Sequence, residues 1–230
     1  MAMHEGHRQR LKARFRAEGL DDFSEVQVLE LLLFYAVPRR DTNPMAHELL
    51  DRFGTLAQVM ETPVEELEKV VGPSAATLLS LMTALTRYYM VSRSGQATIL
   101  SSTEECGDYL LSRFLGRRNE TVFVLCLDAK CKVLGCREMG EGSVNSASVP
   151  IRRIVETALS LNATSVVLAH NHPSGLVSPS ADDVQTTRRL AVALDAVDIL
   201  LADHFVVADD EYVSLAQSGL YQPGSSYTVL

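Results

Sequence analysis

The stretch HNHPSGLVSPSADD, from His170 to Asp183, is the most informative part of this 230-residue chain. It follows the apolar, β-branched run TSVVLA (residues 164–169), which predicts a buried strand that ends in a tight turn. Because side chains alternate along a strand, His170 and His172 should leave the same face of it. Asp183 offers a carboxylate after the chain has turned back. Two histidines and one carboxylate, with a fourth position open to water, are the ligands of a catalytic rather than a structural zinc site, so the sequence predicts Zn²⁺ bound by these three residues.

The end of the same stretch has a second interpretation that needs no metal. Ser180 and Asp183 form the pattern S-x-x-D, which is typical of a capping box that opens a helix. The two interpretations are compatible, because a helix N-terminus would hold Asp183 where the helix dipole favours its negative charge.

The spacing of these residues resembles that of the JAMM (MPN+) metalloproteases, in which His-x-His is followed, after seven residues, by Ser-x-x-Asp. The surrounding sequence is similar to a narrower group, the bacterial RadC family, whose members have long been labelled as DNA repair proteins. The resemblance covers nearly the whole chain. It is carried by four segments: GHRQRLKARF (6–15), ELLLFYAVPRRD (30–41), LNATSVVLAHNHPSG (161–175) and ADHFVVADDEYVSLAQSG (202–219).

The resemblance to JAMM enzymes implies an activity and roles for further residues. JAMM relatives cleave isopeptide or peptide bonds after small C-terminal tails, so the expected partner is a protein or peptide substrate with an extended tail. Glu120, which opens the strand predicted at 121–127, matches the position of the general base. Ser180 matches the serine that stabilises the oxyanion. Glu138 and Glu141 are the alternative bases.

The chain divides into a helical part, a linker and an α/β part. Residues 1–92 predict about five short helices, and residues 93–103 predict a polar linker. Residues 104–230 predict a JAMM/MPN metalloprotease-like domain in which strands and helices alternate, which indicates a mixed sheet flanked by helices. The JAMM resemblance implies the same architecture, similar to the cytidine deaminase fold. The expected strands are 121–127, 131–136, 165–169, 199–202, 204–207 and 212–215.

The helical part contains two candidates for a contact with DNA. PVEELEKVVGPSAATLL (63–79) has the outline of a helix-hairpin-helix, whose glycine-rich turn can bind phosphate at a helix N-terminus. Here the turn is Gly72-Pro73-Ser74, so the second glycine is missing and Pro73 has no N–H to donate. We therefore expect this degenerate hairpin to be structural. A weak DNA contact is better assigned to the basic cluster Arg8, Arg10, Lys12 and Arg14.

Composition limits the remaining possibilities. The net charge of −8 argues against bulk attraction to nucleic acid. No apolar run reaches the roughly 18 residues that a membrane span needs, and the N-terminus lacks the apolar region of a signal peptide. We therefore expect a cytoplasmic protein without membrane contact. The four cysteines should serve as small apolar residues rather than as a disulfide framework or a metal cluster.

Three rival functions were weighed against the metallohydrolase. A nucleobase deaminase on the related fold needs C-x-x-C zinc ligands, which the cysteines of this chain do not provide. An HNH nuclease shares only the letters of residues 170–172, since the residues of that motif are dispersed through a larger unit. A non-enzymatic DNA-associated protein with a structural or vestigial metal site is the main alternative. Asp203 and His204 belong either to the substrate site or to the core.

Overall fold

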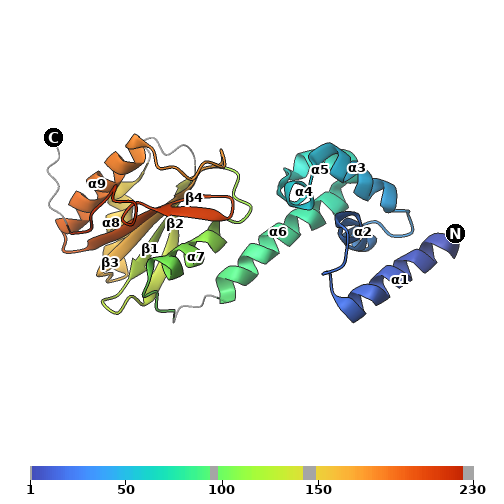
Figure 1. Ribbon diagram of the computed structural model, residues 1–230, viewed down its shortest axis with the longest axis horizontal. Helices are drawn as coiled ribbons and strands as arrows, with labels where there is room; N and C mark the ends of the chain where they lie inside the picture. The colour runs from blue at the N-terminus through green and yellow to red at the C-terminus, as the bar shows by residue number, and fades with distance from the viewer. Residues whose placement is uncertain (1, 94–97, 142–148, 225–230) are drawn as a thin grey trace. The chain divides into compact units, whose positions relative to one another are not determined.

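The computed structural model describes residues 2–93, 98–141 and 149–224 (Figure 1). The chain divides into two compact units, Met1–Thr86 and Arg87–Leu230. The division falls within the longest helix, α6 (Pro73–Arg93), and precedes the boundary predicted at residue 92. The predicted linker includes residues 94–97, which lie outside the described ones. The predicted boundaries of the helical part, the linker and the α/β part therefore stay a prediction.

The first unit is helical, as the sequence predicted. Before α6 it contains α1 (Ala2–Glu18), α2 (Glu25–Ala36), α3 (Asn43–Phe53), α4 (Leu56–Glu61) and α5 (Val64–Val71). The sequence analysis missed α4, which has just 6 residues but begins with a capping box formed by Thr55 and Gln58. The core of this unit is built from fully buried leucines, namely Leu29, Leu33, Leu49, Leu67 and Leu79.

Arg8, in α1, has a structural role within the helical unit. Its exposed fraction is 8%, and its guanidinium donates hydrogen bonds to the backbone carbonyls of Phe34, Val37 and Arg40, at 3.3, 2.7 and 2.5 Å. These carbonyls belong to the end of α2 and the turn after it, where the helix dipole favours a cation. Because its charge is buried against these carbonyls, Arg8 is not available to a phosphate.

The second unit is an α/β domain with a five-stranded mixed sheet, which confirms the predicted fold class (Figure 1). β1 (Thr121–Leu127) pairs antiparallel with β2 (Val133–Glu141) on one side and with β3 (Ser165–Asn171) on the other. β3 pairs parallel with β4 (Leu200–Ala208), which pairs antiparallel with β5 (Glu211–Ser214). The strand order is β2-β1-β3-β4-β5.

Helices cover both faces of this sheet. The core on one face includes residues of α8 (Ile151–Ser160) and α9 (Ala181–Asp195), and the core on the other face includes residues of α7 (Thr103–Phe114). Successive residues of β1 alternate between the two cores, with Val124 in the first and Leu125 in the second. Across the described ranges of both units, no helix is long and apolar enough to cross a membrane.

Two strands differ from the sequence prediction. β2 extends to Glu141, beyond the end predicted at Cys136. β4 is continuous, whereas two short strands were expected on either side of Asp203. Asp203 and its neighbour His204 are both buried within the sheet and form hydrogen bonds there, so the polar side chain of Asp203 does not interrupt the strand.

The cysteines are free thiols, and two of them behave as the apolar residues that were predicted. Cys106 and Cys126 are buried, and burial raises the pKa of each thiol to about 11. Cys131 is exposed at a turn, where its φ is 58°.

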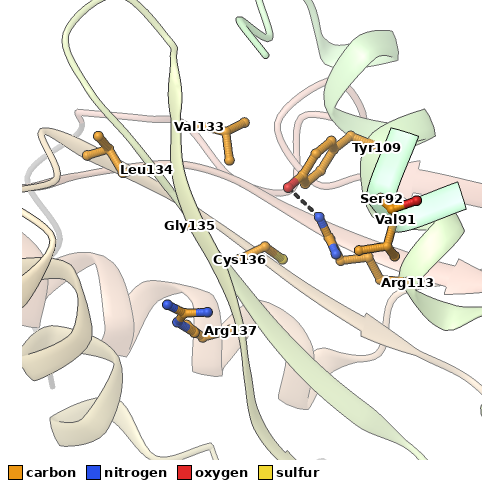
Figure 2. Close-up of a pocket in the computed structure, with 9 residues that line it drawn as sticks. All are labelled: Val91, Ser92, Tyr109, Arg113, Val133, Leu134, Gly135, Cys136 and Arg137. Atoms are coloured by element: carbon orange, nitrogen blue, oxygen red, sulfur yellow. Dashed lines mark hydrogen bonds between the residues drawn. The ribbon is translucent and has the colours of Figure 1, made fainter. Parts of the chain in front are cut away.

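The second unit also contains a cavity of about 320 Å³ between the end of α6, α7 and the start of β2 (Figure 2). Figure 2 shows Arg113 beside Cys136 with its guanidinium hydrogen-bonded to the Tyr109 hydroxyl. Burial raises the pKa of Cys136 to about 12, so the thiol stays neutral. The cavity lining contains no histidine or carboxylate, and the cavity is therefore distinct from the predicted metal site.

Candidate metal centre

The three predicted ligands meet at one end of the sheet. His170 lies at the end of β3, His172 follows directly after this strand, and Asp183 lies in the first turn of α9. The Nε2 atoms of the two histidines are 3.0 Å apart. The Asp183 carboxylate oxygens lie 3.2 Å from Nε2 of His170 and 3.6 Å from Nε2 of His172. His170 and Asp183 are buried, whereas 18% of the His172 side chain is exposed, so the cluster reaches solvent on the side of His172.

These distances are of the size found between the ligands of one metal ion. Zinc takes nitrogen and oxygen ligands at about 2.0–2.2 Å, which places neighbouring ligand atoms of a tetrahedron about 3.3 Å from one another. The two histidine nitrogens are 3.0 Å apart, and they lie 3.2 and 3.6 Å from two different oxygens of the Asp183 carboxylate. The donor types and their spacing therefore fit a zinc ion.

The hydrogen bond of His172 adds a chemical argument for a cation. Its Nδ1 lies 2.8 Å from the backbone carbonyl of Leu176, which can only accept a hydrogen bond, so Nδ1 carries the hydrogen. In the neutral ring, Nε2 is then a bare lone pair directed toward the carboxylate of Asp183. A lone pair and a carboxylate this close repel each other, and a cation bound between them, or a proton on Nε2, removes the repulsion. The residues present thus fit a zinc ion.

Asp183 is held by the capping box that the sequence predicted. The backbone N–H and the hydroxyl of Ser180 donate to Oδ2 of Asp183, at 2.7 and 2.6 Å, and the Asp183 N–H donates to Ser180 Oγ at 3.1 Å. Burial alone would raise the pKa of Asp183, but its contact with His170 and the hydrogen bonds from Ser180 hold this pKa well below its usual value. Asp183 is therefore ionised, and its Oδ1 faces His170 rather than the cap.

Glu120 lies immediately before β1 and is half-buried. One of its carboxylate oxygens and a ring nitrogen each from His170 and His172 all lie within 4.8 Å of one another. The antiparallel pairing of β1 with β3 explains this proximity, because Val122 near the start of β1 is the register partner of His170 at the end of β3. The sheet thus brings the predicted base to the predicted ligands.

Asn171 positions the segment that carries Glu120, a role that the sequence analysis did not assign. Its Oδ1 accepts a hydrogen bond from the Thr121 N–H at 2.7 Å, and its Nδ2 donates to the Asn119 carbonyl at 3.3 Å. The side chain is 5% exposed. One buried amide therefore fixes the backbone on both sides of Glu120.

The alternative bases, Glu138 and Glu141, have other partners on β2. Glu138 forms an ion pair with Arg117 at 2.6 Å, and Glu141 accepts a hydrogen bond from Nδ2 of Asn119 at 2.7 Å. Among the described residues, neither Glu138 nor Glu141 has a carboxylate oxygen that forms a group within 4.8 Å with ring nitrogens of both histidines. The geometry favours Glu120 as the base.

His204, which the sequence placed either in the substrate site or in the core, contacts a proposed ligand. It is fully buried in β4; its Nε2 lies 2.8 Å from Nδ1 of His170, and its Nδ1 lies 2.6 Å from Oγ1 of Thr187. Burial holds the pKa of His204 well below its usual value. The sequence contained one signal for this contact: His204 begins the otherwise apolar segment HFVVA. This segment belongs to β4, the next strand in the chain after β3, which carries His170.

Asp203, the neighbour of His204, belongs to the core. It accepts hydrogen bonds from the Ser214 hydroxyl at 2.5 Å and from the backbone N–H groups of His204 and Ala216 at 2.7 and 3.0 Å. Burial raises the pKa of Asp203 although these bonds oppose the shift. Its bonds tie β4 to the end of β5, so of its two predicted roles the structure supports packing.

A family profile described as "RadC-like JAB domain" matches residues 100–220, which contain the whole sheet and every residue of the candidate metal centre. The chain belongs to the RadC-like JAB domain family. Relatives of this RadC-like chain include a UPF0758 protein of Paraburkholderia xenovorans (strain LB400), 34% identical over 210 residues, which cover 90% of this chain and 83% of that protein. A UPF0758 protein of Ruegeria pomeroyi is 34% identical over 215 residues, or 93% of this chain and 96% of that protein. A third, from Paraburkholderia phytofirmans, is 35% identical over 210 residues, or 90% of this chain and 81% of that protein.

Proposed function

We propose that this RadC-like protein is a zinc-dependent hydrolase of the JAMM type that cleaves peptide or isopeptide bonds. The observation that carries the proposal is the cluster of His170, His172 and Asp183, whose nitrogen and carboxylate atoms approach one another to 3.0–3.6 Å. A structural zinc site is closed by four protein ligands, whereas a catalytic site has three and an open position. The nearby carboxylate of Glu120 supplies the base that such an open position needs.

Each residue of the site has a role in the proposed reaction. A zinc ion bound by the three ligands supplies a Lewis acid and lowers the pKa of water to about 7. Glu120 takes a proton from the attacking water and passes it to the leaving amine. Asn171 keeps Glu120 in place for both transfers through its bonds to the neighbouring backbone. Ser180 exchanges its hydrogen bond to Asp183 for one to the substrate oxygen as negative charge develops there.

The proposed partner is a protein or peptide with an extended tail. His170 and Asp183 are buried, so a scissile bond can approach along the exposed side of His172. The proposal of an extended substrate rests on this limited exposure, since an extended segment needs less access to the cluster than a folded domain does.

Zinc analysis of chelator-free protein tests this proposal. We expect one zinc ion per chain, loss of hydrolysis of a fluorogenic peptide or isopeptide after chelation, and recovery on adding zinc. His172→Ala should lose the metal because it removes one of three ligands. His47→Ala, at an exposed position of α3, is the matched control and should keep it. Wild type without stoichiometric metal, or His172→Ala with full occupancy, contradicts the assignment.

Weak DNA binding through α1 is a separate proposal. With Arg8 buried against α2, the cations of the predicted cluster that remain are Arg10, Lys12 and Arg14. Arg14 itself forms an ion pair with Glu18 at 3.0 Å. The net charge of −8 opposes binding, so any affinity depends on these few contacts.

Replacing Arg10 and Arg14 together by alanine should abolish DNA binding, because two phosphate contacts are lost. Lys69→Ala should matter little, since Lys69 is already paired with Glu66 at 2.5 Å. Fluorescence anisotropy at low and moderate salt provides the measurement, and the wild-type affinity should fall steeply with salt. A large loss from Lys69→Ala with the arginine pair dispensable would reverse this prediction and return the contact to the hairpin.

A further inference from the structure

A chain of hydrogen bonds inside the second unit connects two of the three proposed ligands. It runs from Nδ1 of His170 to Nε2 of His204 over 2.8 Å, and from Nδ1 of His204 to Oγ1 of Thr187 over 2.6 Å. Oγ1 of Thr187 lies 2.6 Å from the backbone carbonyl of Asp183. His204 and Thr187 are both fully buried, so water does not compete for these contacts.

The donor and acceptor of each hydrogen bond can be assigned by starting from the last acceptor in the chain of bonds, the Asp183 carbonyl. The Asp183 carbonyl has no hydrogen, so the Thr187 hydroxyl must donate to it. Oγ1 of Thr187 then accepts from Nδ1 of His204, which places the ring hydrogen of His204 on Nδ1. Full burial favours the neutral ring, so Nε2 of His204 is an acceptor and Nδ1–H of His170 donates to it.

This assignment determines which atom His170 offers to a metal. Because the hydrogen of the neutral His170 ring is held on Nδ1, its Nε2 is a lone pair. That Nε2 faces Nε2 of His172 and Oδ1 of Asp183. The reverse arrangement would place a hydrogen in the middle of the ligand cluster.

We propose that His204 and Thr187 are positioning residues that fix the tautomer and orientation of His170 for metal binding. The proposal rests on the zinc site of the proposed function. Metal-bound histidines usually donate their second N–H to a carboxylate, a carbonyl or water, and changes in such partners typically cost about 10–100-fold in metal affinity. Here a second histidine accepts this bond, and Thr187 orients that histidine in turn. The same threonine lies one helical turn after Asp183, so a single side chain restrains both ligands.

We call the hydrogen-bonded pair His204 and Thr187 the relay. Zinc affinity, measured by competition with a chromogenic chelator, tests its proposed role. Thr187→Val removes the hydroxyl at nearly constant volume and should weaken zinc binding by about 10–100-fold. Thr187→Ser restores the hydroxyl and should recover most of the affinity. Thr186→Val is the matched control, because Thr186 is also fully buried in α9 and its hydroxyl has no hydrogen-bond partner in the described part of the chain. Equal losses in Thr187→Val and Thr186→Val, or no recovery in Thr187→Ser, would overturn the proposal.

The tautomer of His204 gives a second readout that needs no metal. Long-range ¹H–¹⁵N spectra of metal-free wild type should show the His204 hydrogen on Nδ1, and Thr187→Val should lose this preference. A hydrogen on Nε2 of His204 in wild type would contradict the relay directly. If the tautomer is as expected but wild type binds no zinc, the proposed function fails and the metal role of the relay fails with it. If zinc binds and the tautomer is wrong, the relay alone fails.

Discussion

Glu120→Gln should lower the rate of peptide or isopeptide hydrolysis by about 10²–10⁴-fold, the usual contribution of general acid–base catalysis. Glutamine keeps the size and hydrogen bonding of the side chain but cannot accept a proton. The proposed ligands are the two histidines and Asp183, which the substitution leaves unchanged, so zinc should remain bound. Turnover and zinc content measured on the same preparation check both halves of this expectation.

Glu141→Gln is the matched control for this variant. Glu141 lies at the end of β2 and bonds Asn119, the residue before Glu120, so the substitution disturbs the same neighbourhood without removing the base. We expect its turnover to stay close to wild type. Full activity of Glu120→Gln would move the base to Glu138 or Glu141, and loss of zinc would make Glu120 a ligand. If metal-loaded wild type cleaves no amide substrate, the non-enzymatic alternative gains support.

Asp183→Asn should lose both zinc and activity. Asparagine keeps the shape of the side chain but lacks the negative charge, and the loss of a direct ligand should exceed the roughly 10–100-fold cost of changing an outer partner. The first turn of α9 loses a negative charge as well, which should lower stability by about 0.3–1 kcal/mol. Zinc competition and thermal unfolding, performed on the same protein, separate these two effects.

Asp182→Asn serves as the control for Asp183→Asn. Asp182 lies in the same first turn of α9 but is exposed. Both variants remove one negative charge near the helix N-terminus, so both should lose the same favourable interaction with the helix dipole. Only Asp183→Asn removes a proposed ligand, so the two variants should differ in zinc affinity. Equal zinc affinities for the two variants would exclude Asp183 from the ligands.

Local patterns in the sequence were sufficient to predict much of the fold. The run TSVVLA predicts β3 because its apolar, β-branched residues are contiguous, and Ser180 with Asp183 predicts the start of α9 because a capping box is a short-range signal. Strand β1 was predicted with its observed bounds, Thr121–Leu127, for the same reason. Each of these features depends on neighbours within a few residues.

Roles that depend on distant contacts were not predictable in this way. Arg8 is part of a basic run in the sequence, but its partners lie 26, 29 and 32 residues away, so its burial could not be inferred from charge patterning. Asn171 resembles an ordinary turn residue until β1 is placed beside β3. His204 interrupts an apolar strand and becomes intelligible only when β4 lies parallel to β3, with Thr187 above it.

The pairing of β1 with β3 also has a consequence for synthesis. Thr121 and Asn171 are 50 residues apart in the chain, and His204 follows His170 by 34 residues. A ribosome therefore releases the proposed base first, the metal ligands later, and the histidine that orients them last. An N-terminal fragment that ends before His204 therefore lacks part of the proposed site, and a longer chain acquires the site's geometry when β1 and β4 pair with β3.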